Sequence, residues 1–430
     1  MKYNTQNDRI AVITEKTLVV GIDVGSETHY ARAFDNRSFE YSKKPLEFKN
    51  DKSGFKLLHA WMADMMEKHG KTEVLPGMEP TGHYWLNLGA YLQGHGMRPV
   101  LVNPHHVKKS KELDDNNPSK NDRKDPKTIA VLVTEGRYSY PYIPTGVYAE
   151  IRSLSNLRIQ CQEEITRIKN RIARWISIYF PEYKGVYRDT LAVSGLMILK
   201  EAPLPGDIRE LGADGVNQIW RNAKLKAAGM KRAMTLTDAA EHSIGSKEAP
   251  ECARLEIRQL ITDYETYQNR MDDLVTRIDE KMHEIPYIDR ILEIKGIGMK
   301  TASCFVAEVG DLRRFDNSRQ LQKLAGLAIV KNESGKHKGQ SHISYRGRKR
   351  LRYALYEAAV SVIAKNEEFR ELYEYYRTRQ DNPLKKMQAV IAISCKLIRV
   401  FYALLIKGTA YDGEKMMGDI RRPQSGQAVA

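Results

Sequence analysis

Hydrophobic and polar residues along the first third of the chain follow patterns that switch between strand and helix. An apolar run begins at Leu18, and polar and apolar residues then alternate up to Phe34, so Leu18–Phe34 predicts two strands joined as a hairpin. The following segments predict, in order, a helix over Gly54–Gly70, a strand ending at Glu79, a helix over Gly82–His95, a strand over Pro99–Val102 and a helix beginning at Thr128. This order predicts an α/β fold, a mixed sheet with helices on its faces.

The middle of the chain has the spacing of a coiled coil. Apolar residues recur at intervals of three and four from Leu154 to Tyr179 and again from Ile257 to Ile278, which is long enough for two helices that pack along a seam. These runs predict an antiparallel hairpin or a dimer contact. The segment between them, 184–249, is less regular and predicts an inserted helical region.

The last third predicts a mostly helical domain that starts near Pro286. A helix, the turn Gly296-Ile297-Gly298 and a second helix come first, and a helical tail follows over Arg348–Lys407. A glycine turn between helices exposes backbone N–H groups at a helix N-terminus, which suits a phosphate. We therefore expect Gly296 and Gly298 to contact nucleic acid; an ordinary helix–helix turn is the alternative. The predicted domains are 1–150, 151–285 and 286–430.

Composition indicates a globular protein with an anionic partner. Among 430 residues, Lys and Arg outnumber Asp and Glu by 69 to 54, a formal net charge of +15 that favours a polyanion. The four cysteines stand singly, so neither disulfides nor zinc is expected. Lys396 and Arg399 interrupt the most apolar stretch, so we expect no membrane span. The N-terminal residues do not show the charged and then apolar pattern of a signal segment, so we expect a cytoplasmic location.

Four acids of the first domain lie where packing alone would not put them. Asp23 is in mid-strand between two glycines, which leave room for a metal ion or a phosphate beside the carboxylate. Glu79 ends a strand, and Asp122 and Asp125 lie directly before a helix. Together they suit two divalent cations about 4 Å apart, the arrangement used for attack on phosphodiesters. The alternatives are a turn for Asp23, a solvated strand end for Glu79, a charged loop for Asp122 and a helix cap for Asp125.

Basic residues surround both the acids and a serine. Beside the acids they predict a surface for the phosphate backbone, made by Lys108, Lys109, Lys120, Arg123 and Lys124. Eight basic residues and a single acid lie between Lys331 and Arg352, which favours an anionic ligand, with a solvated face as the alternative. The residues expected to bind nucleic acid there are Lys331, Lys336, Lys338, Arg346, Arg348, Lys349 and Arg350. Ser334 lies in this segment, and local chemistry alone favours a turn residue, because no base stands ready to activate its hydroxyl.

These motifs, in this order, resemble the DEDD-type transposases of bacterial insertion sequences. The matching segments read GIDVGSETH, MEPTGHY and KNDRKD in the first domain, and IKGIG, LAGLA, NESGKHKG and GRKRLRYALYEAA in the last. They fall within about 18–133 and 288–405. The resemblance implies an RNase-H/RuvC-like DEDD domain, then an α-helical coiled coil, then a mostly α serine transposase domain with a helix-hairpin-helix.

The resemblance also implies a chemistry and a set of partners. Four acids would bind Mg²⁺ or Mn²⁺: Asp23, Glu79, Asp122 and Asp125. Ser334 would be the nucleophile that forms a phosphoserine link with DNA. Target and donor DNA would be bridged by a structured non-coding RNA, and dimers would assemble into a tetramer in which the acids act beside the serine of another subunit. The protein would work at the nucleoid of a bacterial or archaeal cell. Pro126 departs from the family pattern, which more often has Ala, and 184–249 has no counterpart.

The predicted function is therefore site-specific DNA recombination guided by a bridge RNA. One alternative is a metal-dependent nuclease of the junction-resolving kind, which needs the acids and water but not Ser334. Another is a non-catalytic nucleic-acid scaffold whose acids are structural. A sugar-kinase-like ATPase is disfavoured, because no second phosphate loop or adenosine motif accompanies the first glycine-rich hairpin.

Overall fold

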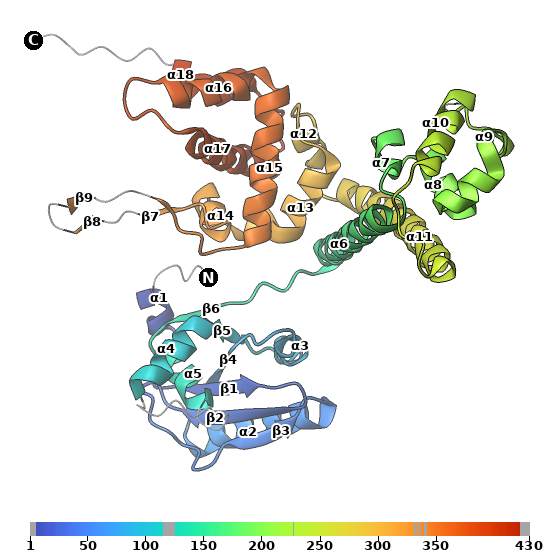
Figure 1. Cartoon of the computed structure of the whole chain (residues 1–430). Helices are drawn as coiled ribbons and strands as arrows, with labels where there is room; N and C mark the ends of the chain where they lie inside the picture. The colour runs from blue at the N-terminus through green and yellow to red at the C-terminus, as the bar shows by residue number, and fades with distance from the viewer. Residues whose placement is uncertain are drawn as a thin grey trace, which may run out of the picture. The chain divides into compact units, whose positions relative to one another are not determined.

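The computed structural model describes residues 6–114, 125–226, 228–330, 333–334, 337–338 and 342–421. Figure 1 shows the order of the elements along the chain. The chain divides into two compact units, Met1–Ile143 and Pro144–Ala430. The first is mixed α/β and the second is mostly helical, as the sequence predicts.

The first unit is built on one mixed sheet. Its strands lie in the order β3-β2-β1-β4-β5-β6, with β1 parallel to β4, β4 parallel to β5, and the other pairs antiparallel. Their bounds are β1 Thr17–Val24, β2 Thr28–Phe34, β3 Leu46–Lys49, β4 Glu73–Met78, β5 Val100–Val102 and β6 Tyr138–Ser139. The hairpin predicted over Leu18–Phe34 is present as β1 and β2, whereas β3 and β6 carry too few residues for a clear pattern.

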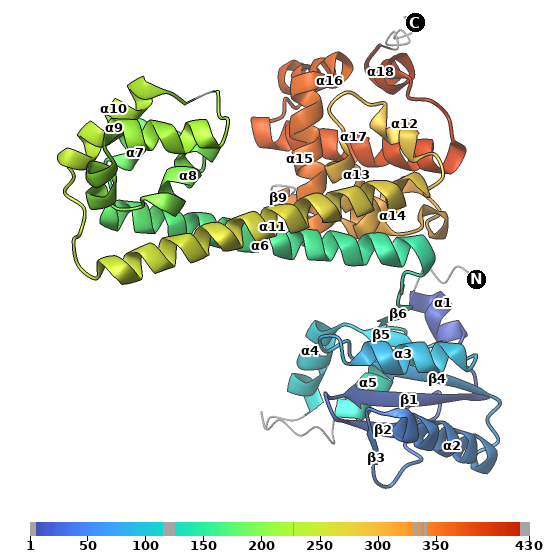
Figure 2. The same cartoon turned by 90° about the vertical axis from the view of Figure 1, so that its right-hand side faces the viewer.

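Helices cover both faces of this sheet (Figure 2). They are α1 Gln6–Ala11, α2 Lys52–Lys68, α3 Trp85–Gly94, α4 Pro104–Asp114 and α5 Asp125–Thr134. Val20 and Ile22 of β1 share a core with α2 and α3, and Val19 shares the opposite core with α5. Because successive side chains of a strand point to opposite faces, β1 is apolar on both sides and lies buried between the two layers. This topology is compatible with an RNase-H-like domain.

The second unit begins with two long helices that run antiparallel. Helix α6 spans Gly146–Tyr179 and helix α11 spans Pro250–His283. Cys161 of α6 contacts the carbonyl of Tyr267, and Trp175, further along α6, donates to the carbonyl of Ala253 at 3.0 Å. Residues with higher numbers on α6 therefore contact residues with lower numbers on α11, so the two helices are antiparallel. Leu157 departs from the predicted seam, because its side chain is 51% exposed.

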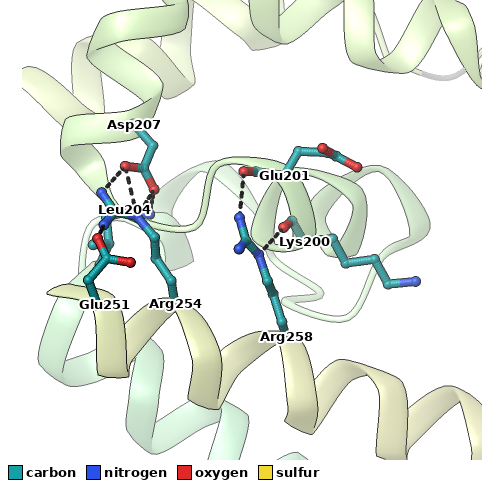
Figure 3. A network of polar contacts seen from close by, with 7 residues as sticks. All are labelled: Lys200, Glu201, Leu204, Asp207, Glu251, Arg254 and Arg258. Atoms are coloured by element: carbon teal, nitrogen blue, oxygen red, sulfur yellow. Dashed lines mark hydrogen bonds and ion pairs between the residues drawn. The ribbon is translucent and has the colours of Figure 1, made fainter.

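Four helices fill the segment between α6 and α11: α7 Tyr183–Val186, α8 Val193–Glu201, α9 Pro205–Asn222 and α10 Met230–Glu241. They share one apolar core with both long helices, around Trp175 and Trp220. A polar network also attaches them to α11 (Figure 3), where Arg254 forms a two-pronged contact with Asp207 and Arg258 donates to the carbonyl of Lys200 at 2.8 Å. The irregular sequence is thus an ordered helical insertion.

The remaining helices of the second unit surround α17 in a second core. Their bounds are α12 Ile288–Leu292, α13 Met299–Val309, α14 Ser318–Leu324, α15 Lys349–Lys365, α16 Glu367–Thr378, α17 Lys386–Lys407 and α18 Gly413–Arg421, with the 3-10 turn η1 Leu312–Arg314. The predicted helical tail is thus three helices, and α18 occupies part of the segment after Asp412. Within the described ranges, α17 alone is long and apolar enough to span a membrane, and 56% of its most apolar window is buried, because Ile393, Leu397 and Phe401 lie in this core.

Candidate functional site

Two of the predicted acids occupy neighbouring positions of the sheet. In the parallel pair β1–β4, Ile22 stands opposite Met78. Asp23 follows Ile22 and Glu79 follows Met78, so the two acids come next on adjacent strands, about 4.8 Å apart between backbones. Both are partly buried. The two acids are 56 positions apart in the sequence, and strand pairing brings them together.

The alternation along β1 assigns Asp23 to the face covered by α5. Val19 packs with α5, and a side chain at Gly21 would lie 1.9 Å from the carbonyl oxygen of Pro126. Asp23 is two residues further and therefore shares that face. On β4, a Cβ at Gly77 would meet Val133 of α5. The same alternation, continued one residue past the strand, puts Glu79 on this face as well.

The third described acid begins the helix on that face. Asp125 is the first residue of α5 and is partly buried. Pro126, which departs from the family pattern, leaves α5 intact, because an N–H in the first helical turn has no intrahelical acceptor to lose. The helix N-terminus also favours negative charge nearby. Asp122 lies outside the described residues.

The two glycines that flank Asp23 have a structural reason that differs from the predicted one. The space beside Gly21 holds the carbonyl of Pro126, and a Cβ at Gly25 would lie 2.4 Å from the carbonyl of Thr28. The chain itself fills these positions, so the glycines permit close backbone packing. The sequence pattern suggested that these glycines leave room for a ligand, but the space beside them is filled by the backbone.

A buried histidine supports the loop that follows Asp23. The Gly25 N–H donates to Nδ1 of His29 at 3.2 Å. The other ring nitrogen, Nε2, faces the Asn50 side chain. Among the described residues, neither His29 Nε2 nor Asn50 Oδ1 has a partner in normal hydrogen-bond geometry. Burial lowers the pKa of His29, so the ring is neutral and can accept from Gly25. The GIDVGSETH motif contained His29, but sequence reasoning assigned it no role.

The donor set at this edge of the sheet fits a hard divalent cation. Asp23, Glu79 and Asp125 supply carboxylate oxygens, the ligands that Mg²⁺ and Mn²⁺ prefer. Elsewhere in the described ranges, the exposed side chains of Asp238, Glu241 and His242 have ligand atoms within 4.8 Å of one another at the end of α10. That second group was not predicted, and it lies in the inserted helical region.

The predicted basic surface near the acids is described only in part. Lys108 and Lys109 lie on α4 and are exposed. Lys120, Arg123 and Lys124 fall outside the described residues.

Ser334 lies on a short strand pair. Strand β8, Glu333–Ser334, pairs antiparallel with β9, His337–Lys338, and Ser334 stands opposite His337. A second antiparallel pair flanks it in the sequence: β7, Ile329–Val330, comes before β8, and its partner β10, His342–Ile343, comes after β9. Lys331 and Lys336 lie outside the described residues, and Lys338 is described only by its place in β9.

The four arginines and lysines before and within α15 divide into two kinds. Arg348 donates to the carbonyl of Glu308 at the end of α13, and Arg350 donates to Asn156 of α6 at 2.8 Å, so both hold helices of this unit together. Arg346 and Lys349 are exposed. A Cβ at Gly347 would lie 2.4 Å from the backbone nitrogen of Gly326, so this glycine too permits close packing of the protein's own backbone.

The two glycines of the α12–α13 turn also differ from each other. Gly296 has φ +99°, and Ser361 of α15 donates to its carbonyl at 2.7 Å. A Cβ there would lie 3.0 Å from the Ser361 carbonyl. Gly298 caps α13 with open space where its Cβ would be. The turn predicted from the sequence is present, but only Gly298 presents its backbone to open space.

Comparison with known proteins identifies the family. A sequence model of DEDD-type elements, described as Transposase, matches residues 20–181, and a model described as Transposase IS116/IS110/IS902 family matches residues 288–374. A 44.8 kDa protein of insertion element IS116 from Streptomyces clavuligerus is 25% identical over 412 residues, 94% of this chain and 96% of that one. The pilin gene-inverting protein of Moraxella bovis is 29% identical over 150 residues, 33% of this chain and 46% of that one.

Both family segments thus coincide with the two motif series read from the sequence, and the IS116 relative matches almost end to end. The chain belongs to the IS110 family of DEDD insertion-sequence transposases and is a DNA transposase or recombinase.

Proposed function

We propose that the protein cleaves and rejoins DNA through a phosphoserine intermediate formed by Ser334, aided by a divalent metal that Asp23, Glu79, Asp122 and Asp125 hold. The observation that carries the proposal is the adjacency of Asp23 and Glu79 on parallel strands, on the face where α5 begins at Asp125. Carboxylates gathered in this way are costly to bury without a cation, and phosphodiester chemistry uses such a cation.

The covalent step conserves the phosphodiester bond. The Ser334 hydroxyl gives up its proton as its oxygen attacks phosphorus, a P–O bond to one DNA strand end breaks, and the leaving oxygen takes up a proton to become a strand-end hydroxyl. The reverse attack by a strand-end hydroxyl releases the serine and joins new partners. When bound, Mg²⁺ or Mn²⁺ would supply charge stabilisation and lower the pKa of the attacking hydroxyl. Asp23, Glu79 and Asp125 would hold and orient that ion.

The finer assignments follow from the same proposal. Residues 1–150 would form an RNase-H/RuvC-like domain, 151–285 a coiled coil with its insertion, and 286–430 the serine domain, with a DNA-contacting helix-hairpin-helix at Gly298. Dimers would join into a tetramer that combines the acids of one subunit with Ser334 of another. A structured non-coding RNA would bridge target and donor DNA at the nucleoid, which the net charge of +15 and the exposed Lys108 and Lys109 support.

The direct test is a trap for covalent protein–DNA adducts. The full chain is incubated with supercoiled target and donor DNA, Mg²⁺ and the non-coding RNA of its own element, then denatured and separated on gels. We expect an adduct with wild type and with the control variant Ser344→Ala, and none with Ser334→Ala. Asp23→Asn should also abolish the adduct, whereas Asp64→Asn, an exposed acid on α2, should retain it.

The other outcomes favour the alternatives. Cleavage without an adduct that survives Ser334→Ala would reject the serine mechanism and favour a metal-dependent nuclease of the junction-resolving kind. Tight RNA binding with neither cleavage nor adduct would favour a non-catalytic scaffold. An adduct that forms without the RNA would reject the guiding role of the RNA and leave the serine chemistry in place.

A further inference from the structure

A cavity lies in the first unit, on the face of the sheet opposite α5. It is a cavity of about 550 Å³ between the N-terminal half of α2 and one face of α3. Small-molecule sites of about 300–1,000 Å³ are typical, so one nucleotide fits this volume. The cavity is lined by Asn50, Asp51, Lys52, Phe55, Lys56, Asn87, Tyr91 and His95.

The floor of the cavity is aromatic. The rings of Phe55 and Tyr91 lie 5.3 Å apart between centroids, and the ring of His95 lies 4.1 Å from that of Tyr91. Phe55 is buried, Tyr91 is partly buried and His95 is exposed, so the aromatic surface extends from the core to the mouth. Base stacking on such side chains is the usual means of holding an unpaired nucleobase.

Amides stand beside this aromatic floor. Asn87 and Tyr91 lie one turn apart on α3, so they share a face of the helix, and Asn87 is exposed at the cavity. An amide offers both a donor and an acceptor, which is what the edge of a base requires. Asn50 lines the opposite wall, but its side-chain amide donates to the carbonyl of Ser26, so Asn87 is the amide that faces the cavity.

The α2 side of the cavity is suited to a phosphate. Lys52 and Lys56 are exposed one turn apart at the start of α2, where the helix dipole adds positive potential. Asp51 also lines the cavity, but its carboxylate accepts from Ser53 at 2.6 Å and from the Gly54 N–H at 2.8 Å. Asp51 is therefore held as the helix cap and stays ionised, so the two lysines outnumber one carboxylate at this end of the cavity.

We propose that this cavity binds one unpaired nucleotide of the nucleic acid on which the protein acts. The base stacks on Tyr91, whose ring packs on the buried Phe55, the Asn87 amide contacts the edge of the base, and Lys52 and Lys56 bind the adjoining phosphate. The proposal uses the family assignment but is independent of the serine mechanism, because its readout is binding. The unpaired nucleotide can come from a displaced DNA strand or from an RNA loop, which share this chemistry.

Hydrogen bonds join one wall of the cavity to the loop that follows Asp23. Asn50 donates from its backbone N–H to the carbonyl of Glu27 at 2.8 Å and from its side chain to the carbonyl of Ser26 at 3.0 Å. One wall of the cavity is therefore hydrogen-bonded to the turn between β1 and β2. A nucleotide held there contacts the residue that fixes this turn.

The test is photocrosslinking of the full-length protein to single-stranded oligonucleotides that carry 5-iodouracil, one RNA and one DNA. Crosslinked peptides are identified by mass spectrometry, with the cleavage-blocking variant Asp23→Asn as the protein. We expect crosslinks at Tyr91 or His95, from one or both probes, and the probe that reacts identifies the source. Crosslinks confined to other segments would overturn the proposal, and so would equal affinity for the single strand and its duplex.

Matched variants separate stacking from folding. Tyr91→Leu should weaken single-strand binding by roughly 5- to 100-fold, while Tyr91→Phe should retain it, since the ring remains. Asn87→Ala, at an exposed position that should not disturb folding, should lower the crosslink yield several-fold, and Gln93→Ala on the same helix should not. Lys52→Ala and Lys56→Ala should reduce the salt dependence of binding, with Lys68→Ala as the control. Wild-type binding by Tyr91→Leu, Asn87→Ala and the two lysine variants of the cavity would refute the site, even if the adduct assay succeeded.

Discussion

Replacing Gly21 by alanine should disturb both the stability of the first unit and its chemistry. The added Cβ would lie 1.9 Å from the Pro126 carbonyl oxygen, whereas real Cβ contacts are essentially never shorter than 3.0 Å. Helix α5 and strand β1 must therefore separate by about 1 Å. The obstacle is backbone on both sides, so a change of side-chain rotamer cannot relieve it.

The size of the effect follows from this displacement. Overpacking of a core costs about 1–3 kcal/mol. For a unit of this length, each kcal/mol lowers the melting temperature by a few degrees. The same shift moves Asp125, at the start of α5, away from Asp23, and a misplacement of about 1 Å at a reacting centre can cost roughly 100-fold in rate.

Two measurements on one variant check this reasoning. Thermal unfolding and the rate of metal-dependent DNA cleavage would be compared for wild type, Gly21→Ala and Gly94→Ala. Gly94 is the control, because a Cβ at that position meets nothing within 4 Å. A Gly21→Ala variant with wild-type melting temperature and rate would refute the close packing of α5 on β1. Loss of stability with full activity would refute the role given to Asp125.

Three further predictions concern other parts of the molecule. Stability should fall as the pH drops below about 6.5, because burial lowers the pKa of His29 in the folded state and protonation favours the unfolded chain; His29→Gln should flatten melting temperature against pH. Arg254→Lys should lose the two-pronged contact with Asp207 and speed amide hydrogen exchange in α9, whereas Arg277→Lys, an exposed pair on α11, should not. Gly296→Ala should cost more than ~1 kcal/mol in chemical denaturation, because φ is +99° there, and Gly298→Ala should cost less.

The fold could be predicted where the hydrophobic pattern was long. The run from Leu18 gave the central strand, and the three-four spacing gave both long helices, because burial of one face dominates those segments. Short strands such as Leu46–Lys49 owe their conformation to pairing with β2, which no local pattern encodes. The segment 184–249 was predicted as helical but without the bounds of its helices, since glycine and proline interrupt their pattern and a core shared with α6 and α11 stabilises them.

The candidate site was predicted as a set of residues but not as a geometry. The sequence indicated Asp23 because a carboxylate in mid-strand is costly to bury without a partner. Its position beside Glu79 depends on the register of two parallel strands, which the sequence does not encode locally. The role of Gly21 was assigned wrongly, because close packing and ligand approach leave the same sequence signature. The α2–α3 cavity was missed, since Asn50, Asn87 and Tyr91 are far apart in sequence and each is ordinary in its own segment.

The insertion between α6 and α11 is closed at its base. The N–H of Ser246 donates to the carbonyl of Ile178 at 2.8 Å, so the chain leaves the helix pair and returns to it at one point. A change in the length of this segment therefore need not alter the path of the chain elsewhere. The same junction is an attachment point for a foreign domain, provided that the replacement covers Trp175, whose ring is only 2% exposed under the native insertion.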